Sequence, residues 1–258
     1  MKVLDYSWGR PGGEAIKAAG FDGVIRYVAY GGDGGKGLRE EELADLRANG
    51  IDIGLVFEST AGRMFDGYPA GSDDAAQCVI SGAAIGFPVD LPFYFACDVD
   101  IDPDMLALVD DYLAGAALVL GRARVGVYGE YDVIEHCHAV GSATWFWQTA
   151  AWSGGKRSDW NHIYQYSNGH VLNGAAVDYN EAVAEFGQWK AREEDDMTPE
   201  EVAAIAAGQF LSLLKQAIGV DVSTFSDYQS VDAIRAHLKA EAIGEHEHVG
   251  GTSGNVKR

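Results

Sequence analysis

Six acidic side chains lie at the ends of short apolar segments in this chain of 258 residues. They are Asp5, Glu58, Asp98, Asp100, Glu130 and Asp178. If the apolar segments are parallel β-strands, all six acids lie at the same end of one sheet. Carboxylates that are brought together repel one another and resist loss of water, so a chain keeps such a cluster mainly where it does chemistry or binds a ligand. The alternative is that each acid caps the helix that follows its strand.

Asp98 and Asp100 form the tightest of these groups. Side chains two residues apart on a strand point to the same side, so both acids are expected to face the mouth of a barrel. Neighbouring carboxylates shift each other's pKa, so that one can stay protonated while the other stays ionised. Glycoside hydrolysis uses these two states, a proton for the leaving oxygen and a negative charge beside the developing cation. Alternatively, residues 98–103 form a turn that caps the next helix, a role that we assign to Asp102.

The segments that position these acids alternate between strand-like and helix-like patterns. Strands are expected at Val3–Leu4, Gly23–Tyr30, Ile51–Phe57, Pro92–Cys97, Arg124–Tyr128, Ala143–Gln148, His162–Tyr166 and Ala175–Asp178. Helices are expected at Gly13–Ala19, Arg39–Asn49, Ser72–Ile85, Pro103–Leu120 and Glu130–Ala139. Strands without polar alternation are typical of a sheet that is covered on both faces. The pattern predicts an α/β fold, a (β/α)8 TIM-type barrel over residues 1–190 that is irregular in its second half.

The net charge of −20 at pH 7 limits the partners of this protein. Nucleic acid and anionic membranes require Lys and Arg, so neither is expected to bind. The three cysteines, at positions 78, 97 and 137, have neither metal-ligand spacing nor a paired framework, which favours buried thiols in a reducing compartment. No metal ion and no other cofactor is predicted.

The composition changes after Trp189. We expect a charged linker at 191–197, a helical appendage at 198–243 and a disordered, Gly-rich tail at 244–258. The helical appendage begins with a capping box at Thr198. Because two isolated helices bury little surface, they are predicted to dock on the barrel, to self-associate or to bind a partner.

Three parts of the chain resemble glycoside hydrolase family 25 lysozymes (muramidases). Val3–Ser7 is similar to the first strand of that family with its active-site Asp, Phe93–Asp100 to the fourth strand with its Asp-x-Glu motif, and Ile163–Ser167 with Val177–Asn180 to the closing strand pair and its Asp. Residues 1–190 resemble more closely the glycoside-hydrolase-like domain-of-unknown-function family 1906, which is found in actinobacteria and in lysins and other proteins of their phages. The resemblance implies a hydrolase of peptidoglycan glycan. The catalytic residues that it implies are Asp98, Asp100, Asp5 and Asp178.

One departure from the lysozyme pattern is that the second motif acid is Asp100, where that family has Glu. Asp is shorter by about 1.5 Å, and a displacement of that size can cost about a hundredfold in rate. The favoured hypothesis is a hydrolase with Asp100 as general acid and Asp98 or Asp178 as electrostatic stabiliser, for which the resemblance implies the substrate's N-acetyl group as nucleophile. The alternatives are a rearranged site in which Glu58 or Glu130 supplies the acid, and a module that binds wall glycan without turnover.

Substrate contacts are expected from aromatic, acidic and amide side chains near the strand ends. Sugar rings stack their C–H faces on aromatic rings, and acids and amides bind their hydroxyls. The predicted substrate-binding residues are Tyr6, Glu58, Tyr128, Glu130, Trp147 and Gln165.

The first residues contain no long apolar stretch, so no signal peptide is expected. A lysin-like protein of this kind is predicted to be made in the cytoplasm and to reach the wall after holin-type release, or to act as part of a bacteriophage virion.

Overall fold

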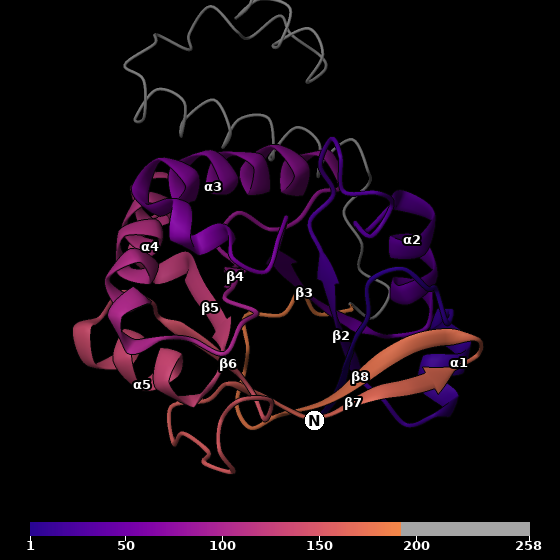
Figure 1. Cartoon of the computed structure of the whole chain (residues 1–258). Coiled ribbons are helices and arrows are strands. Elements are labelled where there is room, and N and C mark those ends of the chain that lie inside the picture. The colour runs from indigo at the N-terminus through magenta and orange to yellow at the C-terminus, as the bar shows by residue number, and fades with distance from the viewer. Residues whose placement is uncertain (192–258) are drawn as a thin grey trace, which may run out of the picture. The chain divides into compact units, whose positions relative to one another are not determined.

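The computed structural model describes residues 1–191, which contain a closed barrel of eight strands (Figure 1). The strands are β1 (Lys2–Asp5), β2 (Gly23–Tyr27), β3 (Asp52–Phe57), β4 (Phe93–Ala96), β5 (Val125–Gly129), β6 (Trp145–Thr149), β7 (Ile163–Leu172) and β8 (Ala175–Ala182). They pair in chain order, and β1 closes the barrel against β8. The predicted α/β barrel of TIM type is therefore confirmed.

The last strand corrects one part of that prediction. Strands β1 to β7 run parallel to one another, whereas β8 is antiparallel to both β7 and β1. The physical reason is the Asn173–Gly174 turn, in which both residues have positive φ angles of 46° and 79°. A two-residue turn of this kind joins antiparallel strands, and it leaves no room for the helical crossover that a parallel strand requires.

Helices cover the barrel in its first five units. They are α1 (Gly13–Ala18), α2 (Glu40–Ala48), α3 (Gly67–Ala84), α4 (Leu106–Leu120) and α5 (Tyr131–Val140), with short 3-10 turns at Arg63–Asp66, Pro103–Met105 and Arg122–Arg124. Figure 1 shows α3, α4 and α5 on one side of the barrel and α1 and α2 on another. Within residues 1–191 no helix follows β6, so the second half is irregular, as predicted.

Helices α3 and α4 lie against each other at glycine contacts. A Cβ atom at Gly71 would lie 1.8 Å from the carbonyl oxygen of Tyr112, and one at Gly115 would lie 2.1 Å from the carbonyl oxygen of Tyr68. These positions need glycine because the two backbones approach so closely. Asp102 caps the 3-10 turn Pro103–Met105, which leads directly into α4, and its side chain accepts a hydrogen bond from the backbone N–H of Asp104 at 3.1 Å. The capping role expected for Asp102 is therefore confirmed.

Alternation along each strand separates the apolar side chains into two sets. The outer set packs beneath the helices and includes Leu4, Val24, Leu55 and Phe95. The inner set fills the barrel and includes Val3, Ile25, Val56, Tyr94 and Phe186. Both faces of the parallel strands are buried, which explains why their sequences show no polar alternation.

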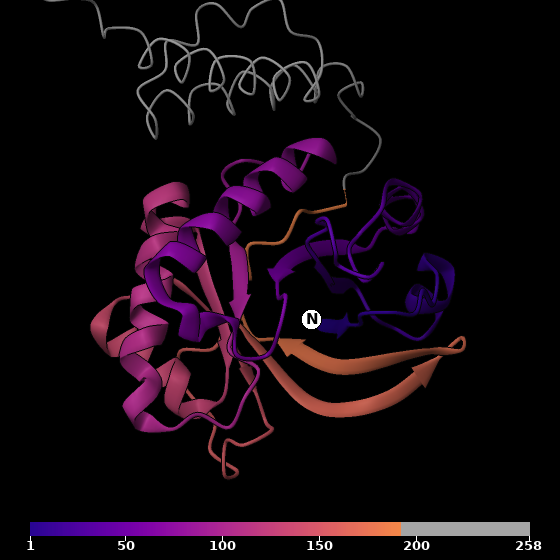
Figure 2. The ribbon, with the colours of Figure 1, turned by 45° about the horizontal axis from the view of Figure 1, so that its top comes forward.

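The β7–β8 hairpin extends beyond the barrel towards α1 (Figure 2). At its turn, Asn173 Nδ2 donates a hydrogen bond to the carbonyl oxygen of Pro11 at 2.7 Å. Gly9 lies so close to Ala175 that a Cβ atom on Gly9 would be 2.4 Å from the Cβ atom of Ala175. The overhanging hairpin is thus fixed to the segment that follows β1.

Apart from Ala191, the predicted charged linker lies outside the described residues. The same is true of the helical appendage at 198–243 and the tail at 244–258, with the self-association or docking expected of those helices.

Candidate active site

Four carboxylates from four different strands gather at the C-terminal end of the parallel strands, and we call them the mouth carboxylates. They are Asp5 after β1, Glu58 after β3, Asp98 after β4 and Asp178 on β8. Asp5 and Asp178 are directly paired across the β1–β8 register. The hydroxyl of Tyr27, on β2, has its pKa raised by burial and by the nearby charges of Glu58, Asp5 and Asp98. The predicted convergence of these acids is therefore present in the structure.

Asp5 is the most deeply buried member of the group, with 6% of its surface exposed. Its Oδ2 accepts hydrogen bonds from Gln165 Nε2 at 2.8 Å and from Asn180 Nδ2 at 2.7 Å. Burial raises its pKa from 3.8 to about 7, the charge of Asp178 adds to the rise, and the two amides oppose it. Asp5 is consequently poised between its neutral and ionised forms near neutral pH.

Asp98 is half-buried at the end of β4. Burial raises its pKa, and the negative charges of Glu58 and Asp178 raise it further, while the Tyr128 hydroxyl and the Lys36 ammonium oppose the rise. In the structure Tyr128 Oη donates its hydrogen bond to Gln165 Oε1 at 3.0 Å, and Gln165 in turn donates to Asp5, which links the surroundings of Asp98 to those of Asp5. A carboxyl group in such a setting can hold a proton and deliver it.

Glu58 and Asp178 are held by charged and polar groups. Glu58 Oε2 lies 3.4 Å from the Nζ atom of Lys36, which comes from the loop after β2. Asp178 Oδ1 accepts a hydrogen bond from the backbone N–H of Gly169 at 2.7 Å. These contacts hold the two carboxylates in place at the barrel mouth.

Asp100 and Glu130 lie apart from the mouth carboxylates, and this corrects the predicted pairing of Asp98 with Asp100. Strand β4 ends at Ala96 and the chain bends at Val99, so the alternation of a strand does not continue to Asp100. Asp100 is exposed, and its charge acts on Glu130. Glu130 is buried, and its Oε1 accepts a hydrogen bond from the backbone N–H of Ile101 at 3.0 Å, so it fixes the chain after β4.

The predicted aromatic contacts are placed differently from what the sequence suggested. Tyr6 follows Asp5, so it points to the outer face of the barrel, where Arg26 lies 4.2 Å from the centre of its ring. Trp147 points inward but is only 3% exposed, and its Nε1 donates a hydrogen bond to Asn180 Oδ1 at 2.8 Å. Tyr6 therefore lies outside the site, and Trp147 holds the Asn180 side chain in place through this hydrogen bond. Tyr128 and Gln165 lie beside the mouth carboxylates, and both side chains are buried, so their contact with a substrate stays a prediction.

Three residues of the site were missed from the sequence. Asn180 lies two positions after Asp178 on the same strand face, and Tyr27 continues the inward face of β2 beyond Ile25, so both could have been found by alternation. Lys36 follows a glycine-rich segment and is not part of a strand, so alternation could not have placed it at the site. Among residues 1–191, no group of three or more His, Cys, Asp or Glu side chains is suited to a metal ion, and no helix is long and apolar enough to cross a membrane.

Comparison with known proteins identifies the family of this chain. A sequence model described as "Rv2525c-like, glycoside hydrolase-like domain" matches residues 14–182. The chain belongs to this family. The protein named "Putative peptidoglycan hydrolase Rv2525c", from Mycobacterium tuberculosis, is 30% identical over 200 residues, which cover 72% of this chain and 83% of that protein. The resemblance to a glycoside-hydrolase-like family is therefore confirmed.

Solved structures show the same relationship for the Rv2525c-like domain. The crystal structure of the Tat-secreted M. tuberculosis protein Rv2525c in complex with L-tartrate has a TM-score of 0.69 and 29% identity, covering 73% of this chain and 98% of that one. An uncharacterised B. stearothermophilus protein shares the fold, with a TM-score of 0.52, 15% identity and coverage of 70% and 95%.

The expected route to the cell wall is wrong. Holin-type release or delivery in a virion was predicted, whereas the M. tuberculosis member of this family is a Tat-secreted protein. Export across a membrane in a relative that covers most of this chain argues against a lysin that waits in the cytoplasm.

Proposed function

We propose that this chain is a peptidoglycan-directed glycoside hydrolase of the muramidase type. Asp98 donates a proton to the glycosidic oxygen as the C–O bond breaks. The carboxylates of Glu58 and Asp178 stabilise the positive charge that develops on the sugar, and water completes the hydrolysis. In keeping with the lysozyme resemblance, the substrate's own N-acetyl group acts as the nucleophile. The observation that carries this proposal is the half-buried Asp98, whose pKa is raised among other carboxylates at the barrel mouth.

The choice of Asp98 over Asp100 as general acid rests on their surroundings. A general acid must remain protonated near the working pH, and burial combined with neighbouring negative charge favours this. Asp98 has both, since it is half-buried beside Glu58 and Asp178. Asp100 is exposed and lies beside Glu130. We therefore move the role of general acid from Asp100 to its neighbour.

The substrate is proposed from the M. tuberculosis relative and from the chemistry of the site. The name of that relative includes peptidoglycan hydrolase. Carboxylates, amides and phenols at one barrel mouth supply the acid, the negative charge and the hydrogen-bond partners that a glycan requires.

The experiment is to incubate the purified protein with purified peptidoglycan and to identify the soluble products by mass spectrometry. Wild type is expected to release fragments with new reducing ends. Asp98→Asn is expected to lower the rate at least about a hundredfold. Asp100→Asn is the matched control, because it makes the same change two residues away, and it should lower the rate less than about tenfold. Equal losses in the two variants, or a greater loss in Asp100→Asn, would contradict this assignment of the acid.

A second candidate function is a wall-glycan-binding module without turnover. The observation that favours it is that the position of the lysozyme-family Glu is occupied by the exposed Asp100. On this hypothesis wild type sediments with purified peptidoglycan and releases no product over many hours. Product release that depends on Asp98 would exclude it.

A further inference from the structure

The loop between β2 and α2 is rich in glycine, yet its backbone is held in place. Arg10 Nη2 donates to the carbonyl oxygens of Gly35 at 2.8 Å and Gly37 at 3.1 Å. Arg26 Nη2 donates to the carbonyl oxygen of Lys36 at 2.9 Å. Three consecutive residues are thus bound through their carbonyl oxygens, and Lys36 lies at the centre of them.

The two arginines are joined by one carboxylate. Glu42 Oε1 lies 2.7 Å from Arg26 Nε, and Glu42 Oε2 lies 2.6 Å from Arg10 Nε. Arg26 is fully buried, so this pairing is needed to offset the loss of its hydration. We call Arg10, Glu42 and Arg26 the arginine clamp.

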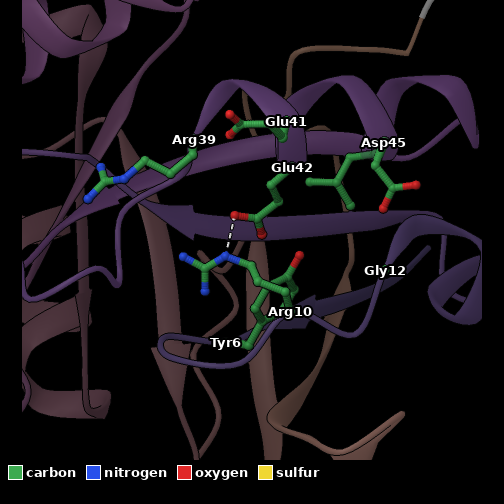
Figure 3. A pocket seen from close by; sticks show the side chains of 8 residues that line it. Tyr6, Arg10, Gly12, Arg39, Glu41, Glu42 and Asp45 are labelled. Atoms are coloured by element: carbon green, nitrogen blue, oxygen red, sulfur yellow. Dashed lines mark ion pairs between the residues drawn. The ribbon is translucent and has the colours of Figure 1, made fainter.

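Figure 3 shows one side of the arginine clamp, in a cavity of about 360 Å³ between the segment after β1 and helix α2. The cations that line this cavity are already occupied. Arg10 binds Glu42 and backbone carbonyls, and Arg39 Nη2 binds both carboxylate oxygens of Asp33 at 2.9 Å. The cavity is therefore the outer side of a structural network rather than an anion site.

The Lys36 side chain points from the clamped loop to the mouth carboxylates. It is only 9% exposed. Its Nζ atom lies 3.4 Å from Glu58 Oε2 and 4.4 Å from the centre of the Tyr27 ring. A buried ammonium group is costly unless it is paired, so these contacts fix its position.

We propose that Lys36 is a positioning residue of the active site, which orients the Glu58 carboxylate and is itself held by the arginine clamp on the outer face of the barrel. This inference rests on the proposed function and adds a residue to it. The lysine contacts Glu58 and the face of Tyr27, so it acts through these two side chains.

The positive charge of Lys36 also affects the pKa of Asp98, in a direction that can be measured. The groups that face Asp98 are Glu58 and Asp178, which raise its pKa, and Tyr128 and Lys36, which lower it. Tyr27 stands beside the same carboxylates. Removing the positive charge must therefore raise the pKa of Asp98 further. Because Asp98 acts in its protonated form, the alkaline limb of the pH–rate profile must move to higher pH.

The experiment compares Lys36→Met with the conservative variant Lys36→Arg. Two readouts are followed, the pH dependence of kcat/KM on peptidoglycan and the titration of the Asp98 carboxyl carbon by ¹³C NMR. Lys36→Met is expected to raise the pKa of Asp98, because a nearby positive charge is lost. It is also expected to lower kcat at least about tenfold, because Glu58 is no longer oriented. Lys36→Arg should restore most of both properties. Lys17→Met is the control for loss of a lysine, since Lys17 pairs with Asp22 at the surface. If Lys36→Met does not fold, Lys36→Gln removes the same charge.

The outcomes separate this inference from the proposed function. An active wild type, with an Asp98 titration and a pH–rate profile that do not change in Lys36→Met, would overturn the role of Lys36. A wild type that cleaves no peptidoglycan would overturn the proposed function. In that case the NMR titration still decides whether Lys36 is coupled to the carboxylates.

Discussion

Replacing Asp5 by Asn is expected to stabilise the protein at neutral and higher pH. Asp5 is buried and accepts two hydrogen bonds, from Gln165 and Asn180. An Asn side chain keeps a carbonyl oxygen for both donors and has nearly the shape of the protonated acid. The substitution therefore removes the ionisable carboxyl group and keeps the acceptor oxygen.

The magnitude follows from the pKa of Asp5. Its folded-state value is about 7, raised from 3.8, mainly by burial. A shift of about three units at 1.36 kcal/mol per unit corresponds to about 4 kcal/mol. Because the folded state holds the proton more tightly, this contribution is fully present below about pH 4 and is lost as the pH rises to about 7. Between about pH 4 and about pH 7, the ionisation of Asp5 should therefore lower the free energy of unfolding of wild type by about 1.4 kcal/mol per pH unit. Asp5→Asn should lack this contribution.

The assay is urea denaturation of both proteins from about pH 5 to about pH 8. Subtracting one free energy of unfolding from the other cancels the groups that titrate alike in the two proteins. The difference should grow in favour of Asp5→Asn across the window. Asp159→Asn, which removes an exposed carboxylate, is the control. A difference that stays constant from pH 5 to pH 8 would show that Asp5 does not hold a proton in the folded state.

Three further predictions test the barrel mouth and the packing of the fold around it. Trp8 is 66% exposed just beyond β1, where its ring could stack on a sugar. Trp8→Ala is therefore expected to raise KM for peptidoglycan about three- to tenfold with little change in kcat. Unchanged kinetics would exclude sugar stacking on Trp8. Gly115→Ala places a methyl group against the carbonyl of Tyr68, and it should lower the free energy of unfolding by about 1–3 kcal/mol in urea titrations. Glu42→Leu leaves Arg26 buried without its carboxylate and should cost about 3–5 kcal/mol in the same assay. A loss below about 1 kcal/mol would show that the arginine clamp is not structural.

The barrel could be predicted because its strands are buried on both faces. Continuous apolar segments such as Ile53–Phe57 and Phe93–Ala96 are typical of strands in a parallel sheet, and the glycines and helix starts between them fix the alternation of strand and helix. The direction of β8 was missed, although Asn173–Gly174 between two strand-like segments is a strong signal for a two-residue hairpin. The general barrel pattern was given more weight than this local turn.

The gathering of acids at the barrel mouth was predicted in part, and the errors concern the direction in which individual side chains point. Apolar strands do not show which residues face inward, so Asp5 and its neighbour Tyr6 were both assigned to the site. Consecutive residues on a strand point to opposite sides, so both assignments could not hold. The pairing of Asp98 with Asp100 failed for the complementary reason, because alternation was extended past the end of β4. No rule of spacing could have found Lys36, whose position depends on the distant arginine clamp.

The two halves of the barrel provide different partners to the mouth carboxylates. The antiparallel direction of β8 places Asp178 opposite Asp5 and puts Asn180 on the same inward face, where its amide donates to Asp5. Gln165 on β7 supplies the second amide, so the hairpin provides neutral donors to the most buried acid. The helical half supplies the positive charge, since Lys36 reaches Glu58 from a loop that is bound to α2 through Glu42 and the two arginines. Neutral donors leave Asp5 able to hold a proton, whereas Glu58 faces the positive charge of Lys36, so the two halves of the barrel give two carboxylates of one group different surroundings.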